Sequence, residues 1–310
     1  METNAKIQAL MTKHHLSPFS KSAYRACLHE CFQNGNGIAA LQLLEDMKQE
    51  SGLEWEAKDL QLTIMALCRN NKEDPGLWRR ALELLNLGVS DGDSENKVID
   101  MVAVEAYNAV IHCMEDEKEW KEAKQLLSKM ENHLNVHPLP TLATYHAVLQ
   151  VYSAASKPED AVKLVLSLSS IPTPDNLAPN SSITRKPRPS QYTYELVFST
   201  LLSNKYRRGE YYGAAIQILE TMKTSKVPIS TVFYNRVMNA CAKGRDTSMA
   251  MRLFGDMRKQ KVSPDTVTFN SLISANAAAG RTRDALELLK ECLNEPGVEP
   301  DIITYTNAIR

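Results

Sequence analysis

Residues 231–265 read TVFYNRVMNACAKGRDTSMAMRLFGDMRKQKVSPD, and residues 266–301 read TVTFNSLISANAAAGRTRDALELLKECLNEPGVEPD. The two stretches are near-copies that lie end to end, 35 and 36 residues long. A third copy begins at residue 302 with IITYT. Self-similarity at a fixed period of roughly 20–50 residues is the sequence signature of a repeat protein, so the chain is expected to be an array of similar units.

Each copy carries an apolar stripe in its second half at positions i, i+3, i+4 and i+7. The stripe residues are Ala250, Leu253, Phe254 and Met257 in one copy and Ala285, Leu288, Leu289 and Cys292 in the next. This spacing marks one face of an α-helix, so each copy predicts a helix, a turn and a second helix. We expect Gly244 and Gly280 to take the left-handed conformation that closes the first helix. Pro264 and Pro300 are expected to stop the second helix.

The same stripe recurs along the whole chain and predicts about seven hairpins. Its first residue is an alanine, at Ala40, Ala81, Ala123, Ala161, Ala215, Ala250 and Ala285. An aromatic residue enters nearly every first helix, at Tyr24, Tyr107, Tyr145, Tyr194, Tyr234, Phe269 and Tyr305, with Leu60 in the second repeat. A single hairpin cannot cover its own stripe, so neighbouring hairpins must stack into an all-α solenoid.

The spacing also divides the chain into segments. Residues 1–20 form an N-terminal segment, and residues 21–168 hold four degenerate repeats. Residues 169–190 are rich in proline and serine and predict a loop. Residues 191–310 hold repeats five to seven and the start of an eighth.

Composition narrows the class of protein. With 43% hydrophobic and 24% charged residues the chain is typical of globular proteins, and its net charge of −1 provides no overall field that attracts nucleic acid. The six cysteines lack disulfide-scaffold spacing, which favours a reducing compartment.

No run approaches the roughly 18 apolar residues of a membrane span. Residues 1–20 match a transit peptide poorly, so the targeting segment is absent from this chain or the protein is not imported.

The aromatic-Asn start, the glycine before the stripe and the Pro-Asp end resemble the pentatricopeptide repeat family. The Trp, Leu-Gly and Tyr signature of the alternative, the tetratricopeptide repeat, is missing. The resemblance implies an all-α fold, a right-handed superhelix of helical-hairpin repeats like that of tetratricopeptide repeat proteins. It also implies binding of single-stranded RNA, one base per repeat. A mitochondrial or chloroplast transcript is the implied target.

The resemblance further implies which residues read the bases. The polar residue after the aromatic pairs with the last residue of the repeat, and an apolar residue three places earlier packs on the base. Carried over, this assigns the pairs Asn235 with Asp265, Asn270 with Asp301 and Asn108 with Thr141, the packing residues Val232 and Val267, and Thr306 in the third copy. The Asn-Asp combination favours uracil in the family, which predicts two adjacent uridines.

The other upstream repeats depart from the pattern. Their corresponding pairs are Arg25/Glu56, Gln61/Ala103, His146/Ser190 and Glu195/Ser230. A simpler explanation exists for the repeat-end residue, because Asp, Ser and Thr are good helix N-caps worth about 1 kcal/mol without any ligand. Asparagine inside a helix is less easily explained in this way.

Phosphate contacts require basic residues. The sequence places Arg69 and Lys243 late in first helices, where the family often has one, and a further cluster at Lys205, Arg207 and Arg208. We expect no cofactor and no metal site, since the cysteine pair Cys27 and Cys31 has no second pair to complete a tetrahedral set.

No nucleophile elbow, phosphate-binding glycine loop or zinc-deaminase motif is present, so the chain is not expected to be an enzyme. The function predicted is sequence-selective RNA binding in organellar RNA processing, stability or translation. Two alternatives stay open: a protein-binding helical-repeat scaffold, and the RNA-targeting part of an enzyme whose catalytic domain lies elsewhere. Under both alternatives, the degenerate N-terminal repeats are candidates for binding a protein partner.

Overall fold

A computed structural model describes residues 20–49, 52–69, 76–90, 102–132, 137–169, 186–201 and 211–309. These ranges contain 15 α-helices and no strand. The first helices of successive hairpins are α2 (Lys21–Asn34), α4 (Ala57–Arg69), α6 (Val104–Glu117), α8 (Leu142–Ala154), α10 (Gln191–Leu201), α12 (Thr231–Lys243), α14 (Thr266–Ala278) and α16 (Ile302–Ile309). The second helices are α3 (Gly37–Gln49), α5 (Leu77–Ser90), α7 (Trp120–Asn132), α9 (Pro158–Ser169), α11 (Tyr212–Thr224), α13 (Thr247–Lys259) and α15 (Thr282–Asn294). The predicted all-α hairpin fold is confirmed.

The chain divides into two compact units. One comprises residues 1–155 and 182–187, and the other comprises residues 156–181 and 188–310. Most of the predicted N-terminal segment and most of the predicted loop at 169–190 lie outside the described residues, as does the basic cluster at 205–208. The predicted division of the chain at these segments stays a prediction.

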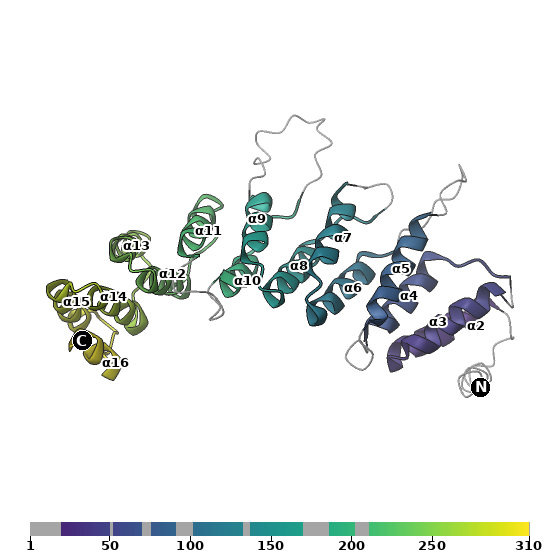
Figure 1. Ribbon diagram of the computed structural model, residues 1–310, viewed down its shortest axis with the longest axis horizontal. Helices are drawn as coiled ribbons and strands as arrows, with labels where there is room; N and C mark the ends of the chain where they lie inside the picture. Colours follow the sequence, from purple (N-terminus) through teal and green to yellow (C-terminus); the bar gives the residue numbers. More distant parts are fainter. Residues whose placement is uncertain are drawn as a thin grey trace, which may run out of the picture. The chain divides into compact units, whose positions relative to one another are not determined.

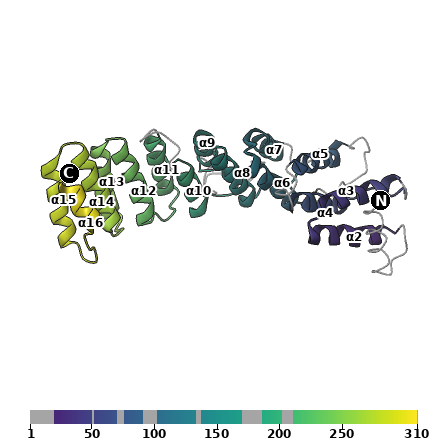
Figure 2. The same ribbon diagram turned by 60° about the horizontal axis from the view of Figure 1, so that its bottom comes forward.

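Within each unit several first helices pack on one another from one hairpin to the next. In one unit α4 packs between α2 and α6, and α6 packs on α8 (Figure 1). In the other, α14 packs between α12 and α16, and the second helices α11, α13 and α15 lie against α10, α12 and α14 (Figure 2). One face of the first helices therefore carries the stacking, which leaves another face for ligands.

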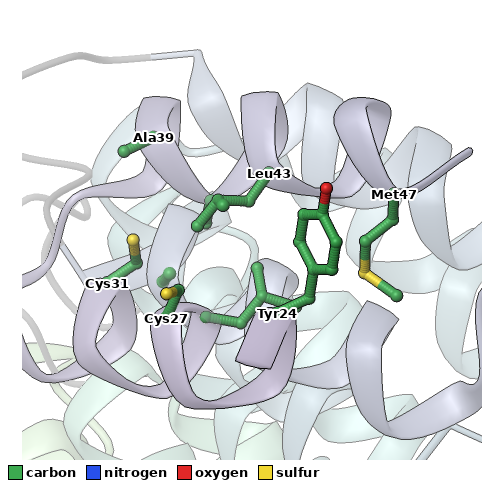
Figure 3. Packing of buried hydrophobic residues seen from close by; sticks show 9 residues of the cluster. Tyr24, Cys27, Cys31, Ala39, Leu43 and Met47 are labelled. Atoms are coloured by element: carbon green, nitrogen blue, oxygen red, sulfur yellow. The ribbon is translucent and has the colours of Figure 1, made fainter. Parts of the chain in front are cut away.

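The core consists of the residues that the repeat pattern predicts. The first-helix aromatics are at most 3% exposed, except Tyr305 of α16 at 44%. In the first hairpin, Tyr24 and Cys27 of α2 point toward Leu43 and Met47 of α3 (Figure 3). Burying a leucine or methionine side chain stabilises a fold by roughly 1.5–3 kcal/mol, so the stripe supplies much of the stability of each hairpin.

The left-handed residue of the turn between the first and second helix is a glycine in only one of the two clear copies. Gly280 has a φ of +72°, as predicted. Gly244 has a φ of −77°, and the left-handed residue is Arg245 at +61°, so the prediction for Gly244 was wrong. A Cβ atom at Gly244 would lie 3.1 Å from Cδ1 of Tyr212. At this position the absence of a side chain gives room to Tyr212, and the backbone conformation does not call for glycine.

The prolines do not stop the second helices. Helix α13 ends at Lys259 and α15 at Asn294, and the left-handed residues that follow are Lys261 and Gly297, at φ of 58° and 78°. Pro264 and Pro300 stand later, in the extended segments before the next first helix. The helix ends are set by these left-handed turns, and the prolines only keep the following segment extended.

All six cysteines are free thiols. Burial raises the pKa of Cys31 to about 11 and that of Cys241 to about 12, which keeps both protonated at neutral pH. No group of His, Cys, Asp and Glu side chains suited to a metal occurs in the described parts of the chain. None of the helices described is long and apolar enough to cross a lipid bilayer.

Candidate functional site

The structure brings Asn235 and Asp265 into contact. Asn235 lies in the second turn of α12, and Asp265 is the N-cap of α14. The Nδ2 atom of Asn235 donates to Oδ1 of Asp265 at 2.8 Å. The same oxygen accepts the backbone N–H of Thr268 at 2.8 Å. Two residues far apart in sequence therefore meet because α13 returns the chain to the start of the next first helix.

The second pair repeats this geometry. Nδ2 of Asn270 donates to Oδ1 of Asp301 at 3.1 Å. The backbone N–H and the hydroxyl of Thr304 donate to the same carboxylate oxygen, each at 2.8 Å. These bonds, that from the Thr304 N–H above all, hold the pKa of Asp301 below its usual value. The carboxylate is therefore ionised at neutral pH and acts only as an acceptor.

An exposed valine accompanies each pair. Val232 and Val267 are both 56% exposed, although most other apolar side chains of α12 and α14 are buried. Each stands three residues before the asparagine of its pair, which places the two side chains on one helix face. Ile303 takes the same place in α16 and is 59% exposed. This arrangement suits a flat ring with a polar edge. The face of the ring would contact the apolar side chain, and its edge would form hydrogen bonds with the polar pair.

The third predicted pair is not brought together in the same way. Among the described residues no hydrogen bond joins Asn108 to Thr141, and Oδ1 of Asn108 is buried without a partner. The Thr141 hydroxyl instead lies 3.3 Å from Oγ1 of Thr144, within the cap of α8. A threonine side chain is shorter than that of aspartate, so it caps its own helix without reaching the preceding hairpin.

The remaining predicted residues are exposed. Thr306 lies on α16, and its hydroxyl donates to the carbonyl of Ile302 at 2.6 Å. Lys243 is exposed as the last residue of α12 and has no ion-pair partner among the described residues. Arg69 differs, because its Nη1 donates to the carbonyl of Phe32 at 3.0 Å. Arg69 thus satisfies the C-terminal end of α2, and Lys243 stays available for an anion.

Arg25 and Glu56 depart from the repeat pattern in sequence. They nevertheless occupy the place of the Asn-Asp pair in the first hairpin, and they form an ion pair. Nε of Arg25 also contacts Oδ1 of Asp59 at 2.7 Å, and the Asp59 side chain is fully buried. These carboxylates, Asp59 foremost, raise the pKa of Arg25. Lys21 lies 2.5 Å from Glu56 as well. The first hairpin therefore has an ion-pair network where the last two have an amide and a carboxylate.

Asp59 and Thr268 are the residues that the sequence alone did not single out. Each is the third residue of its first helix, as are Thr193 and Thr304. The signal was present in the sequence, because a threonine or aspartate recurs three residues after the end of most repeats. Its partner in the preceding hairpin becomes visible only in three dimensions.

Comparisons with known protein families identify repeats along this chain. A model of the PPR repeat family matches residues 229–278 and 264–310, and a model described as the pentacotripeptide-repeat region of PRORP matches residues 12–171. A search of curated proteins finds no match for the chain.

Two of the solved structures that match the chain are those of one pentatricopeptide repeat protein, without and with RNA. The crystal structure of the pentatricopeptide repeat protein PPR10 from maize is 20% identical with a TM-score of 0.50, over 99% of this chain and 40% of that one. A crystal structure of PPR10 in complex with an 18-nt psaJ RNA element is 18% identical with a TM-score of 0.37, over 99% and 45%. The chain thus spans less than half the length of these proteins. The match to the repeat-region model extends over more than half of this chain, which belongs to the pentatricopeptide repeat family.

Proposed function

We propose that the chain binds single-stranded RNA along the exposed faces of its first helices and reads bases at the hairpins of residues 231–265 and 266–301. Family membership supports this, since each such repeat reads one base with two or three side chains. The observation that carries the proposal is the contact of Asn235 with Asp265, repeated by Asn270 with Asp301.

The chemistry of the pair favours uracil. Within the part of the chain that the structure describes, the hydrogen bonds to the Asp265 carboxylate use Oδ1, which leaves Oδ2 as an acceptor. The Asn235 amide group has a second N–H besides the one that it donates to Asp265. Uracil presents a ring N–H beside a carbonyl oxygen, which complements an acceptor beside a donor. Cytosine presents a ring nitrogen lone pair at that place and would face the carboxylate, so we expect uridine at both positions.

The surroundings supply the other contacts that a nucleotide needs. Val232 and Val267 offer exposed apolar surface for the base faces. The exposed Lys243 supports a phosphate contact, and such a contact would make the affinity depend on salt. Because the net charge of the chain is −1, we expect modest affinity from this chain.

A fluorescence-anisotropy titration tests the function. The whole chain is titrated with unstructured uridine-rich RNA and cytidine-rich RNA of equal length, at two salt concentrations. Tighter binding of the uridine-rich RNA that weakens with salt is the expected result. Equal affinity for both RNAs would remove the base-reading role, and no binding to either would remove RNA as the ligand of this chain.

Replacing Asn235 and Asn270 together by alanine should lower the preference for uridine. A good base contact discriminates by about 1–3 kcal/mol, which corresponds to roughly 5- to 150-fold in affinity for each site. The control is Asn294→Ala, which removes an exposed asparagine of α15 that bonds only to its own helix. Circular dichroism should show the same helix content in all three proteins. An unchanged preference in the double variant would contradict the assignment.

The cellular role is part of the proposal. By family resemblance the target is a mitochondrial or chloroplast transcript, and the role is in its processing, stability or translation. A second candidate function, the RNA-targeting part of an enzyme, is favoured by one observation: residues 12–171 match the repeat region of a larger protein. Assay of the full-length gene product for RNA cleavage or base modification distinguishes this alternative from binding alone.

A further inference from the structure

Thr268 lies directly behind the pair formed by Asn235 and Asp265. It is the third residue of α14 and is fully buried. Its hydroxyl donates to Oδ1 of Asn235 at 2.6 Å and lies 2.9 Å from Oδ1 of Asp265. The backbone N–H of Asp265 donates to the same hydroxyl at 3.1 Å. Thr268 therefore touches both reading residues without being exposed to a ligand.

The carboxylate decides which way the Asn235 amide points. If the amide were turned over, its oxygen would lie 2.8 Å from Oδ1 of Asp265, and two acceptors would face each other. The amide nitrogen must therefore face Asp265, and the amide oxygen must face Thr268. Asn235 is only 7% exposed, so its oxygen needs this donor.

The same contact occurs independently in the other unit. Asp59, the third residue of α4, contacts Nε of Arg25 in the preceding hairpin at 2.7 Å and accepts the backbone N–H of Glu56 at 3.0 Å. The third residue of a first helix thus reaches the fifth residue of the preceding one in both units. The group at this third residue differs with its partner. A threonine hydroxyl contacts an amide in one unit, and an aspartate carboxylate contacts a guanidinium in the other.

The last pair lacks this contact. Thr304 bonds to Asp301 as Thr268 bonds to Asp265, yet Oδ1 of Asn270 is buried without a hydrogen-bond partner in the described part of the chain. Two pairs that are identical in sequence are therefore held differently. The amide of Asn235 is fixed at both ends, and that of Asn270 at one end.

We propose that Thr268 is a positioning residue for base reading, which fixes the orientation of the Asn235 amide and thereby raises the selectivity for uridine over cytidine. The inference rests on the proposed RNA binding. Without the hydroxyl, the buried amide oxygen of Asn235 has no donor, and the side chain gains by turning away from Asp265 to find one. The donor beside the carboxylate is then no longer held in place.

The test compares Thr268→Val, which removes the hydroxyl at nearly constant volume, with Thr268→Ser, which keeps it. Affinities for a uridine-rich and a cytidine-rich RNA are measured for each protein, and the ratio is the readout. One neutral hydrogen bond is worth about 1 kcal/mol, so the valine variant should lose about fivefold in the uridine preference and the serine variant should keep it. Thr144→Val is the matched control, because Thr144 is a buried capping threonine and Oδ1 of Asn108 has no partner.

A valine variant that loses stability as Thr144→Val does but keeps the full uridine preference would show that the hydroxyl only caps α14. That result overturns this inference and leaves the RNA binding intact. A wild-type protein without uridine preference overturns both proposals.

A second measurement uses the wild-type chain without RNA, so it tests how the Asn235 amide is held even if the Thr268→Val variant does not fold. In the ¹⁵N spectrum of the wild-type chain, the side-chain amide hydrogen that Asn235 donates to Asp265 should exchange with solvent at least about tenfold more slowly than those of the exposed Asn294, since a buried hydrogen bond must open first. Equal exchange rates would contradict an amide held at both ends.

Discussion

At the scale of single residues, corresponding positions of the repeat hold different polar groups that make the same connection between hairpins. Asn235 with Asp265 and Arg25 with Glu56 both join a first helix to the start of the next hairpin. The amide pair keeps a donor and an acceptor for a ligand. The ion pair uses its charges internally, which is consistent with a first hairpin that contributes stability and does not read a base.

The buried carboxylate of Asp59 should be the most important polar group between the first and second hairpins. Asp59→Ala leaves Arg25 without its main partner and the N-terminal end of α4 without a cap bond to Glu56. Hydrogen bonds to charged groups are worth about 1.5–3 kcal/mol, and the partly exposed guanidinium recovers some hydration, so we expect a loss of about 2 kcal/mol in the free energy of unfolding.

Urea denaturation measures this loss. Glu83→Ala is the control, because the Glu83 carboxylate pairs with Arg80 on the surface at 3.0 Å with both side chains at least 60% exposed. Such a pair contributes at most about 1 kcal/mol. Equal losses in the two variants would mean that Asp59 has no special role.

At the scale of elements, the hairpin turn is conformationally equivalent in the two clear copies, but its glycines serve different purposes. Gly280 is left-handed, and a Cβ atom there would meet nothing within 4 Å. Gly244 is right-handed and packs under Tyr212. Arg245 takes the left-handed conformation instead, so that turn is made by a residue for which it is less favourable.

Alanine substitutions should separate the two roles. Gly280→Ala should cost about 1–2 kcal/mol, because alanine must adopt the left-handed conformation. Gly244→Ala should change the free energy of unfolding by less than about 0.5 kcal/mol, since the better helix propensity of alanine offsets the small shift required of Tyr212. Chemical denaturation of both variants checks the difference. A larger loss at Gly244 than at Gly280 would contradict this assignment of roles.

At the scale of the whole molecule, the main helix contacts of the described residues run within a hairpin or to the next hairpin of the same unit. The stability of such an array is approximately a sum of hairpin and neighbour terms. A local defect should therefore loosen nearby hairpins and leave distant ones unchanged. The buried cysteines are natural reporters, since they occur in both units and their thiols react only when exposed.

Met257→Ala tests this locality. Met257 is fully buried in the stripe of α13, and truncating a buried methionine costs about 2–5 kcal/mol. Alkylation followed by mass spectrometry should show much faster labelling of Cys241, in the same hairpin, and an unchanged rate at Cys27 in the other unit. Equal acceleration at both cysteines would indicate that the chain unfolds as one cooperative body.

The sequence by itself determined the helical hairpins, their starting residues and their core, because a fixed period of apolar residues has only one way to be buried. It also indicated the Asn and Asp residues of the candidate site, through the resemblance that their positions carry. It assigned both turn glycines the same role, because composition does not show whether Tyr212 or the backbone conformation requires Gly244. Only the tertiary structure decided that Asn235 meets Asp265, that Arg25 forms an ion pair with Glu56, and that Thr268 supports one pair. These contacts join residues of neighbouring hairpins, and their distances depend on how the helices stack, which no local pattern specifies.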